Sequence, residues 1–236
     1  KVNFTMDTEL KNPKLVQKKS KKLLDKVRSD FLGLNTTYKI ANSKQTRRIY
    51  LDSTASTLMM GIAHRTSEKF LKHYSNTHSL MHFSAKIATK TYKWVHERML
   101  KFVSADSEHY TCFFTGSGTT SGMNRIARIF NNLQPKKDIV LVSIMEHHSN
   151  DLPHRKHGGH VIHIPVDTHE SKMGCVDMDL LEHYLKEYEG RVNYVSITGI
   201  SNVTGIINPI NEVAKLAHHY GAYIVVDAAQ MAAHVP

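Results

Sequence analysis

The stretch Tyr223-Ile224-Val225-Val226-Asp227-Ala228-Ala229-Gln230 decides the fold class, because it predicts a buried strand that ends directly in polar side chains. Strands rich in Val and Ile are typical of a parallel sheet that is covered on both faces. The chain contains several similar apolar runs. The other predicted strands are Tyr110–Phe114, Ile139–Ser143, His160–Val166 and Val192–Thr198, with a short one at Ile49–Asp52.

Segments with helical spacing of apolar residues separate most of these strands. Alternation of strands and helices predicts an α/β fold, a three-layer sandwich with a mostly parallel sheet between two layers of helices. The predicted helices are Ile62–Tyr74, Ser84–Val103, Thr119–Leu133, Met178–Tyr188 and Pro209–Tyr220.

The charge of the chain is concentrated near its start. Of the net charge of +10 over 236 residues, residues 1–48 contribute +9, from 13 Lys/Arg and 4 Asp/Glu. We therefore predict two parts, a basic N-terminal helical segment over residues 1–48 and the main domain over residues 49–236. The helix is expected to begin at Asn12-Pro13 and to end at Gly33. We favour a solvated helix that packs its apolar stripe on the body; binding to RNA or a membrane surface is the alternative.

The composition excludes several other classes of protein. No apolar run approaches the roughly 18 residues of a membrane span, and no apolar signal segment is visible. Two cysteines cannot form a disulfide framework. We expect a cytoplasmic protein that does not contact a membrane. We do not expect nucleic acid to be its partner. Cys112 is predicted to be an inert core thiol in a strand.

The glycine-rich stretch Gly116-Ser117-Gly118-Thr119-Thr120 precedes a predicted helix. Free N–H groups and the dipole at a helix start suit a phosphate group. A P-loop would need a lysine before its Ser/Thr, and none is present. A dinucleotide site would need an acid at the end of the second strand, whereas Asp138 precedes its strand. The remaining alternative is an ordinary tight turn.

Polar groups also follow the other predicted strands, and in parallel sheets ligands bind at the carboxyl ends. Asp227 at such an end can hold a positively charged ring nitrogen, as a pyridinium cofactor requires. The imidazole of His147 can stack on such a ring, while Asn202 and Gln230 can donate to a ring oxygen. The alternatives are a capping Asp, a core His and a turn-forming Asn.

Together these motifs resemble the pyridoxal-phosphate enzymes of fold type I, in the class V aminotransferase group that includes cysteine desulfurases and selenocysteine lyases. The resemblance runs from about Tyr50 to the last residue. The matching stretches are Tyr50–Thr57, Asn76–Ser79, Phe114–Asn124, Glu146–Asn150, Ser201–Gly205 and Asp227–Gln230 with His234.

The resemblance implies a role for each matching residue. Pyridoxal 5'-phosphate would be bound at its phosphate, at its ring face and at its ring nitrogen and oxygen. The implied cofactor-binding residues are Gly118, Thr119 and Thr120 for the phosphate, His147 for the ring face, Asp227 for the ring nitrogen, and Gln230 and Asn202 for the ring oxygen. His147 is also the implied catalytic residue, through proton transfer. Asn76 and His78 would lie near the substrate entrance.

The resemblance also implies a Schiff-base lysine on the strand after the Asp-x-x-Gln motif, and no lysine of this chain occupies that motif. We therefore expect the N-terminal, partial large domain of an enzyme whose whole form is a homodimer acting on a small amino acid. The first expectation is a cysteine desulfurase or selenocysteine lyase. The alternatives are a class V aminotransferase or epimerase, and a truncated, non-catalytic cofactor-binding or interaction module.

A histidine series needs a separate interpretation. His154, His157, His160 and His163 recur at every third residue. Gly158-Gly159 should break any helix there, and residues 160 and 163 on one strand point to opposite faces. We predict no metal site and solvated loop histidines instead.

Overall fold

The computed structural model describes residues 20–169 and 172–235. The chain divides into two compact units, Lys1–Trp94 and Val95–Pro236, and the boundary falls within a helix. The predicted division at residues 48 and 49 stays a prediction. Each unit is described separately below.

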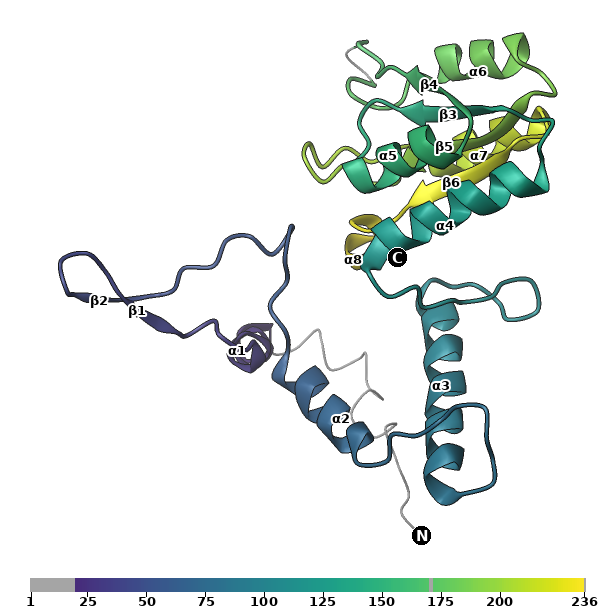
Figure 1. Cartoon of the computed structure of the whole chain (residues 1–236). Coiled ribbons are helices and arrows are strands. Elements are labelled where there is room, and N and C mark those ends of the chain that lie inside the picture. Colours follow the sequence, from purple (N-terminus) through teal and green to yellow (C-terminus); the bar gives the residue numbers. More distant parts are fainter. Residues whose placement is uncertain (1–19, 170–171, 236) are drawn as a thin grey trace. The chain divides into compact units, whose positions relative to one another are not determined.

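The first unit contains helices, one short two-stranded sheet and long irregular segments (Figure 1). Its elements are α1 (Ser20–Asp30), β1 (Thr37–Lys39), β2 (Gln45–Arg47), α2 (Gly61–Leu71) and the greater part of α3 (Phe83–Phe102). The Asp30 carboxylate accepts a hydrogen bond from the backbone N–H of Ile62 at 2.8 Å and pairs with Arg65 at 3.0 Å. The end of α1 is thereby tied to the start of α2.

One expectation for this unit is wrong. Residues 49–52 form no strand, and Ile49 and Leu51 are 80% and 90% exposed, because no described strand lies beside them to pair with. Within α1, Leu24 is 64% exposed, and the expected packing of its apolar stripe on the main domain stays a prediction. The proposed start of the basic helix at Asn12-Pro13 lies outside the described residues.

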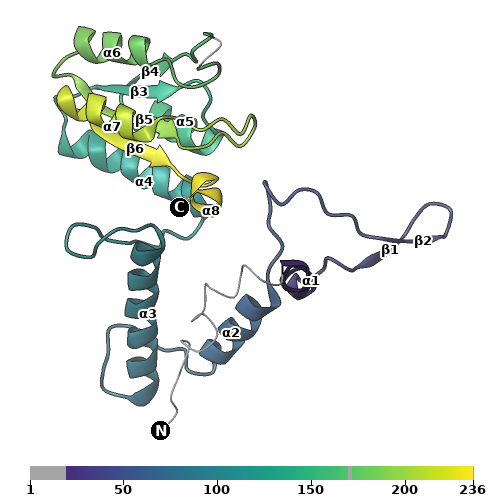
Figure 2. The ribbon, with the colours of Figure 1, turned by 180° about the vertical axis from the view of Figure 1, so that it is seen from behind.

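The second unit is built around a four-stranded parallel sheet of order β4-β3-β5-β6. Figures 1 and 2 show helices on both sides of it. Its elements after α3 are α4 (Gly118–Leu133), β3 (Ile139–Ser143), α5 (His148–His157), β4 (His160–Ile164), α6 (Met178–Glu187), β5 (Val192–Thr198), α7 (Ile210–His219), β6 (Tyr223–Asp227) and α8 (Met231–His234).

Two apolar cores, one on each face of the sheet, confirm the three-layer sandwich. Successive strand residues point to opposite faces. In β3, Ile139 and Leu141 pack with α6 and α7, whereas Val140 and Val142 pack with Met123 of α4. Every residue of β3 and β5 is buried, as expected for strands covered on both sides.

In the second unit, most predicted elements are confirmed, several of them to the residue, but one predicted strand is not. Tyr110–Phe114 carries a strand-like sequence and forms no strand, since within the described residues it has no partner strand. Phe113 is largely exposed, and Cys112 is only partly buried, so the expected core thiol is also wrong.

Helix α5 is the main element that the sequence did not predict. Its sequence, His148-Ser-Asn-Asp-Leu-Pro-His-Arg-Lys-His157, is almost entirely polar and contains a proline. Gly158 follows its last residue, so the glycine pair ends the helix rather than preventing it. The histidines were expected in a solvated loop. That expectation is wrong for His154, which lies in α5 and is fully buried.

The longest helix, α3, has 20 residues and carries several charged side chains. Among the helices in residues 20–169 and 172–235, none is both long and apolar enough to cross a membrane.

The fold predicts a large difference between two Leu→Ala variants. Leu141 is fully buried in the central strand β3, whereas Leu152 on α5 is 54% exposed. Leu141→Ala should lower the free energy of unfolding by about 2–5 kcal/mol, because it leaves a cavity in the core. Leu152→Ala should change it by less than about 0.5 kcal/mol. Urea unfolding followed by circular dichroism measures both, and equal effects would contradict the assigned register of β3.

Candidate functional site

Three strand ends of the second unit carry polar side chains at one edge of the sheet. Strand β3 runs into Glu146 and His147, β5 ends at Thr198, and β6 ends at Asp227. Thr198 and Asp227 are register partners across β5 and β6. Because the strands are parallel, their carboxyl ends lie together, and this edge is the candidate site.

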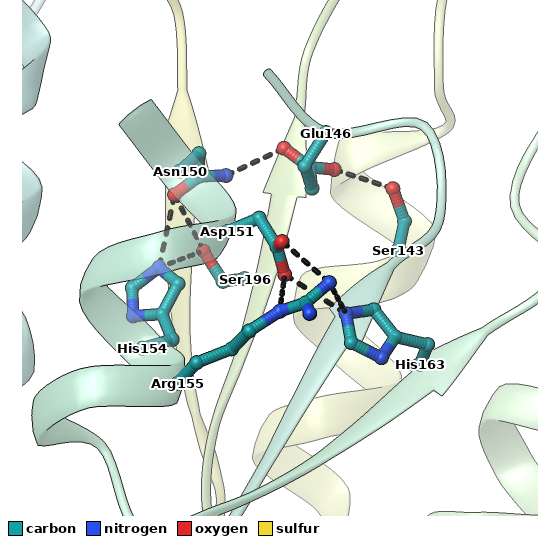
Figure 3. A network of polar contacts seen from close by, with 8 residues as sticks. All are labelled: Ser143, Glu146, Asn150, Asp151, His154, Arg155, His163 and Ser196. Carbon is teal, nitrogen blue, oxygen red and sulfur yellow. Dashed lines mark hydrogen bonds and ion pairs between the residues drawn. The ribbon is translucent and has the colours of Figure 1, made fainter. Parts of the chain in front are cut away.

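Glu146 joins the ends of two strands to the start of α5. Its carboxylate accepts hydrogen bonds from the backbone N–H of Thr198 at 2.7 Å, from the side-chain amide of Asn150 at 2.5 Å and from the hydroxyl of Ser143. Figure 3 shows the contacts with Ser143 and Asn150. Three donors on one carboxylate suit its ionised form.

Burial raises the pKa of Glu146 above its ordinary value. The hydrogen bonds from Ser143, Asn150 and Thr198 act in the opposite direction, and the like charge of Asp227 adds to the rise. The influence of Asp227 reflects how close the two carboxylates lie at this edge.

A buried chain of side chains continues from Glu146 into the core. The carbonyl oxygen of Asn150 lies 3.0 Å from Nε2 of His154, and Nδ1 of His154 lies 2.8 Å from the hydroxyl of Tyr194. Ser196 of β5 donates to the same Asn150 oxygen at 2.9 Å. Asn150, His154, Tyr194 and Ser196 are all fully buried. Burial lowers the pKa of His154 to about 4, so the ring is neutral at pH 7.

A second polar group consists of Asp151 and Arg155 of α5 and His163 of β4. Asp151 pairs with Arg155 at 2.7 Å and with Nε2 of His163 at 2.8 Å (Figure 3). Burial acts to raise the pKa of Asp151, but the hydrogen bonds and charges of Arg155 and His163 outweigh it and lower the pKa. This group fixes α5 against β4.

His147 lies between the end of β3 and the start of α5. It is the N-cap of α5, and its Nδ1 accepts a hydrogen bond from the backbone N–H of Ser149 at 3.1 Å. The side chain is exposed. The cap holds one edge of the imidazole in place, and the role of its ring face stays a prediction.

The glycine-rich stretch leads directly into α4. Gly116 and Gly118 have φ values of +91° and +58°, and a Cβ atom at either position would meet nothing within 4 Å. The first N–H groups of α4, which include those of Thr119 and Thr120, have no carbonyl one turn earlier to bind. Figures 1 and 2 both show the start of α4 beside α8, which follows Asp227. The open helix start and Asp227 therefore lie at the same edge.

Asp227 is the buried acid of this edge, with 4% of its surface exposed. Its Oδ1 accepts from the backbone N–H of Ala229 at 3.0 Å. Within residues 20–169 and 172–235, no Lys, Arg or His forms an ion pair with it. Asp138, by contrast, lies exposed at the opposite edge and pairs with Arg191 at 2.7 Å, which agrees with its exclusion as a ribose ligand.

The remaining predicted residues occupy loops and turns. Asn202 is exposed in the turn after β5, and Gln230 is the N-cap of α8. Asn76 and His78 lie in the first unit, between α2 and α3, where the Asn76 side chain accepts from the His78 backbone N–H at 2.6 Å. The structure thus gathers Gly118, Thr119, Thr120, His147 and Asp227 in one unit with Asn202 and Gln230. The substrate role of Asn76 and His78 stays a prediction.

Sequence reasoning missed the residues that support the site, above all Asn150, His154, Tyr194 and Ser196. They are polar and buried, so no apolar periodicity marks them. A usable signal existed in the spacing of Glu146, Asn150 and His154, which recur at every fourth residue, as on one face of a helix. The described residues contain no group of three or more His, Cys, Asp or Glu side chains placed to hold a metal ion.

Residues 49–236 match the model of the family described as aminotransferase class-V, and the chain belongs to that family. A probable cysteine desulfurase of Halalkalibacterium halodurans is 30% identical over 193 residues, which are 79% of this chain and 45% of that protein. A cysteine desulfurase of Escherichia coli is 31% identical over 222 residues, covering 90% of this chain and 50% of that protein.

Solved structures agree with the fold. The apo structure of a cysteine desulfurase from Thermococcus onnurineus has a TM-score of 0.68 at 27% identity, over 86% of this chain and 47% of that one. A crystal structure of an Escherichia coli cysteine desulfurase has a TM-score of 0.64 at 24% identity, over 90% of this chain and 50% of that one. The chain thus spans about half the length of the relatives it matches.

The depressed pKa of His154 predicts a pH-dependent stability. Between pH 6.5 and about 4, the unfolded chain binds a proton on this residue and the folded chain does not. The free energy of unfolding should therefore fall by up to roughly 1.4 kcal/mol per pH unit as the pH drops through this range. Gln at position 154 can donate and accept at similar places without titrating.

His154→Gln should accordingly lose less stability than the wild type over the same range, as measured by urea unfolding at several pH values. The comparison cancels the contributions of the carboxylates common to both proteins. Parallel stability curves for the two proteins would show that His154 is protonated equally in the folded and unfolded states.

Proposed function

We propose that this chain forms the cofactor-binding N-terminal part of a pyridoxal-phosphate enzyme, whose whole form is a cysteine desulfurase or selenocysteine lyase acting on an amino acid. The observation that carries the proposal is a site whose two ends favour opposite charges. The start of α4 offers the N–H groups of Thr119 and Thr120 to an anion, whereas the N–H of Gly118 already binds the carbonyl of Gly116 at 2.7 Å. Asp227 offers a buried carboxylate to a cation.

The donor set fits this cofactor. Pyridoxal phosphate has a phosphate at one end and a ring nitrogen that is positive when protonated at the other. The space above Gly116 and Gly118 is open, which leaves room for a phosphate at the helix start. Asp227 has no described cationic partner of its own, so a ring N–H would supply the missing one.

The chain's own residues then have separable tasks. Gly118, Thr119 and Thr120 would bind the phosphate, and His147 would cover the ring face. Asp227 would keep the ring nitrogen protonated through a charge-assisted hydrogen bond. Asn202 and Gln230 would bind the ring oxygen. The bound cofactor supplies a positively charged ring that withdraws electrons from a carbon atom of the substrate.

The choice of reaction follows from the relatives. Those at 30–31% identity are named cysteine desulfurases, and His147 lies in the stretch Glu146-His147-His148-Ser149-Asn150. We therefore propose that the whole enzyme cleaves a bond from carbon to sulfur or selenium, with the imidazole of His147 able to move a proton at the site.

The proposed cofactor site can be tested without a Schiff-base lysine by using pyridoxamine 5'-phosphate. This ligand carries an amine in place of the aldehyde, so it does not need to react with a lysine. We expect saturable binding to the 236-residue chain, followed by the fluorescence of the ligand. Asp227→Asn keeps the size and one hydrogen-bond acceptor but removes the charge. It should weaken binding by roughly 10- to 100-fold, because a charge-assisted hydrogen bond is lost.

Asp138→Asn is the matched control, since Asp138 lies at the other edge of the sheet and should leave binding unchanged. Equal loss in both variants would mean that binding is a matter of overall charge. If the wild-type chain binds no pyridoxamine phosphate at all, the proposed function is wrong.

A further inference from the structure

The hydrogen bonds that link Glu146, Asn150, His154 and Tyr194 can run in only one direction from donor to acceptor. The backbone N–H of Thr198 can only donate, so the Glu146 oxygen that it contacts at 2.7 Å is an acceptor. A carboxylate accepts only, and Asn150 must therefore turn its NH₂ group towards Glu146, with 2.5 Å between the nitrogen and the oxygen. Its carbonyl oxygen consequently faces the core.

The direction continues through His154. The Asn150 oxygen is an acceptor at 3.0 Å from Nε2 of His154, so this nitrogen carries the hydrogen. The hydroxyl of Ser196 also lies 3.0 Å from Nε2, and because it donates its one hydrogen to the Asn150 oxygen, it acts as an acceptor there. The ring is neutral, and Nδ1 is then a bare acceptor 2.8 Å from the hydroxyl of Tyr194. Tyr194 can donate there, because burial raises the pKa of its hydroxyl and keeps it protonated. Every member of the chain thus has one role.

We propose that Glu146 is a positioning residue of the candidate site, and that its negative charge sets the direction of the chain Asn150–His154–Tyr194, which in turn holds the carboxylate in place. The proposal rests on the proposed function for the identity of the cofactor, but the direction of the chain stands on the contacts alone.

Glu146 is placed to act on the residues that would hold the cofactor ring. It directly precedes His147, and it binds the backbone of Thr198, the register partner of Asp227. Loss of its charge would weaken the hydrogen bond to the backbone N–H of Thr198 and disturb the first turn of α5 at the same time. Glu146 would thus affect the binding of the cofactor ring through His147 and Thr198, without contacting the ring itself.

The decisive variant is Glu146→Gln, which keeps the size of the side chain. Its oxygen can still accept from Ser143 and Thr198, but its NH₂ group would then face the NH₂ group of Asn150. Two donors cannot bond, so the Asn150 amide must turn over and present its NH₂ group to His154. His154 would respond by moving its hydrogen from Nε2 to Nδ1, with Tyr194 accepting.

Nitrogen-15 NMR of the histidine rings at pH 7 distinguishes the two tautomers. We expect His154 with the hydrogen on Nε2 in the wild type and on Nδ1 in Glu146→Gln. The matched control is Glu182→Gln, on the exposed face of α6, which should leave His154 unchanged. An unchanged tautomer in folded Glu146→Gln would overturn the proposal.

Tyr194→Phe tests the chain from its other end, and it serves also if Glu146→Gln fails to fold. The variant removes the donor to Nδ1 but leaves Glu146 charged. If Glu146 sets the direction, His154 keeps its hydrogen on Nε2. A shift to Nδ1 would show that Tyr194 sets the direction, contrary to the proposal.

Binding of pyridoxamine 5'-phosphate tests the positioning role. Glu146→Gln should weaken it by roughly tenfold, the size of effect seen when a supporting hydrogen-bonded partner is lost, whereas Glu182→Gln should not. A tautomer change with unaltered affinity would overturn the positioning role. If the wild type binds no ligand, the proposed function and the positioning role fail together, while the NMR result still decides whether Glu146 sets the direction.

Discussion

The buried carboxylate of Glu146 is the contact on which the arrangement of the candidate site depends. It is the point where β3, β5 and α5 meet, through Ser143, Thr198 and Asn150. The strands themselves are held by apolar packing on both faces, and that packing fixes the sheet but not the conformation of the segments beyond it. A charged acceptor with three donors supplies the missing constraint. It orders the edge at which the parallel strands end.

Such a network is costly as a means of stability. Removing polar groups from water consumes much of the energy that their hydrogen bonds return, and an apolar replacement of equal shape is often as stable. His154 illustrates the cost, since burial holds it neutral with a pKa of about 4. The network is better understood as a source of specificity. Each group is satisfied in one arrangement, and shifting any of them would leave a buried donor or acceptor without a partner.

The sequence predicted those elements that an apolar pattern marks, and it failed where hydrogen bonds or a partner strand decide the structure. Strands β3, β5 and β6 have continuous apolar runs, and their limits were predicted to the residue. Gly118, Thr119, Thr120, His147 and Asp227 were predicted as site residues because glycines, strand ends and family motifs mark them, and their roles stay predictions. Helix α5 was missed because hydrogen bonds, rather than apolar surface, satisfy its buried face. Tyr110–Phe114 was wrongly assigned because a strand requires a partner, and the local sequence does not specify one.

The glycine pair at the end of α5 has a consequence for how this protein can change over evolution. A Cβ atom at Gly158 would lie 2.9 Å from the hydroxyl of Tyr194 and 2.8 Å from the carbonyl of His154, and one at Gly159 would lie 2.5 Å from the carbonyl of Asp138. A side chain at residue 158 would therefore meet a backbone oxygen as well as the Tyr194 hydroxyl, so a smaller residue at position 194 would not by itself make room for it. That smaller residue would also remove the donor to His154. Position 158 is therefore closed to other residues unless the backbone at the end of α5 moves as well.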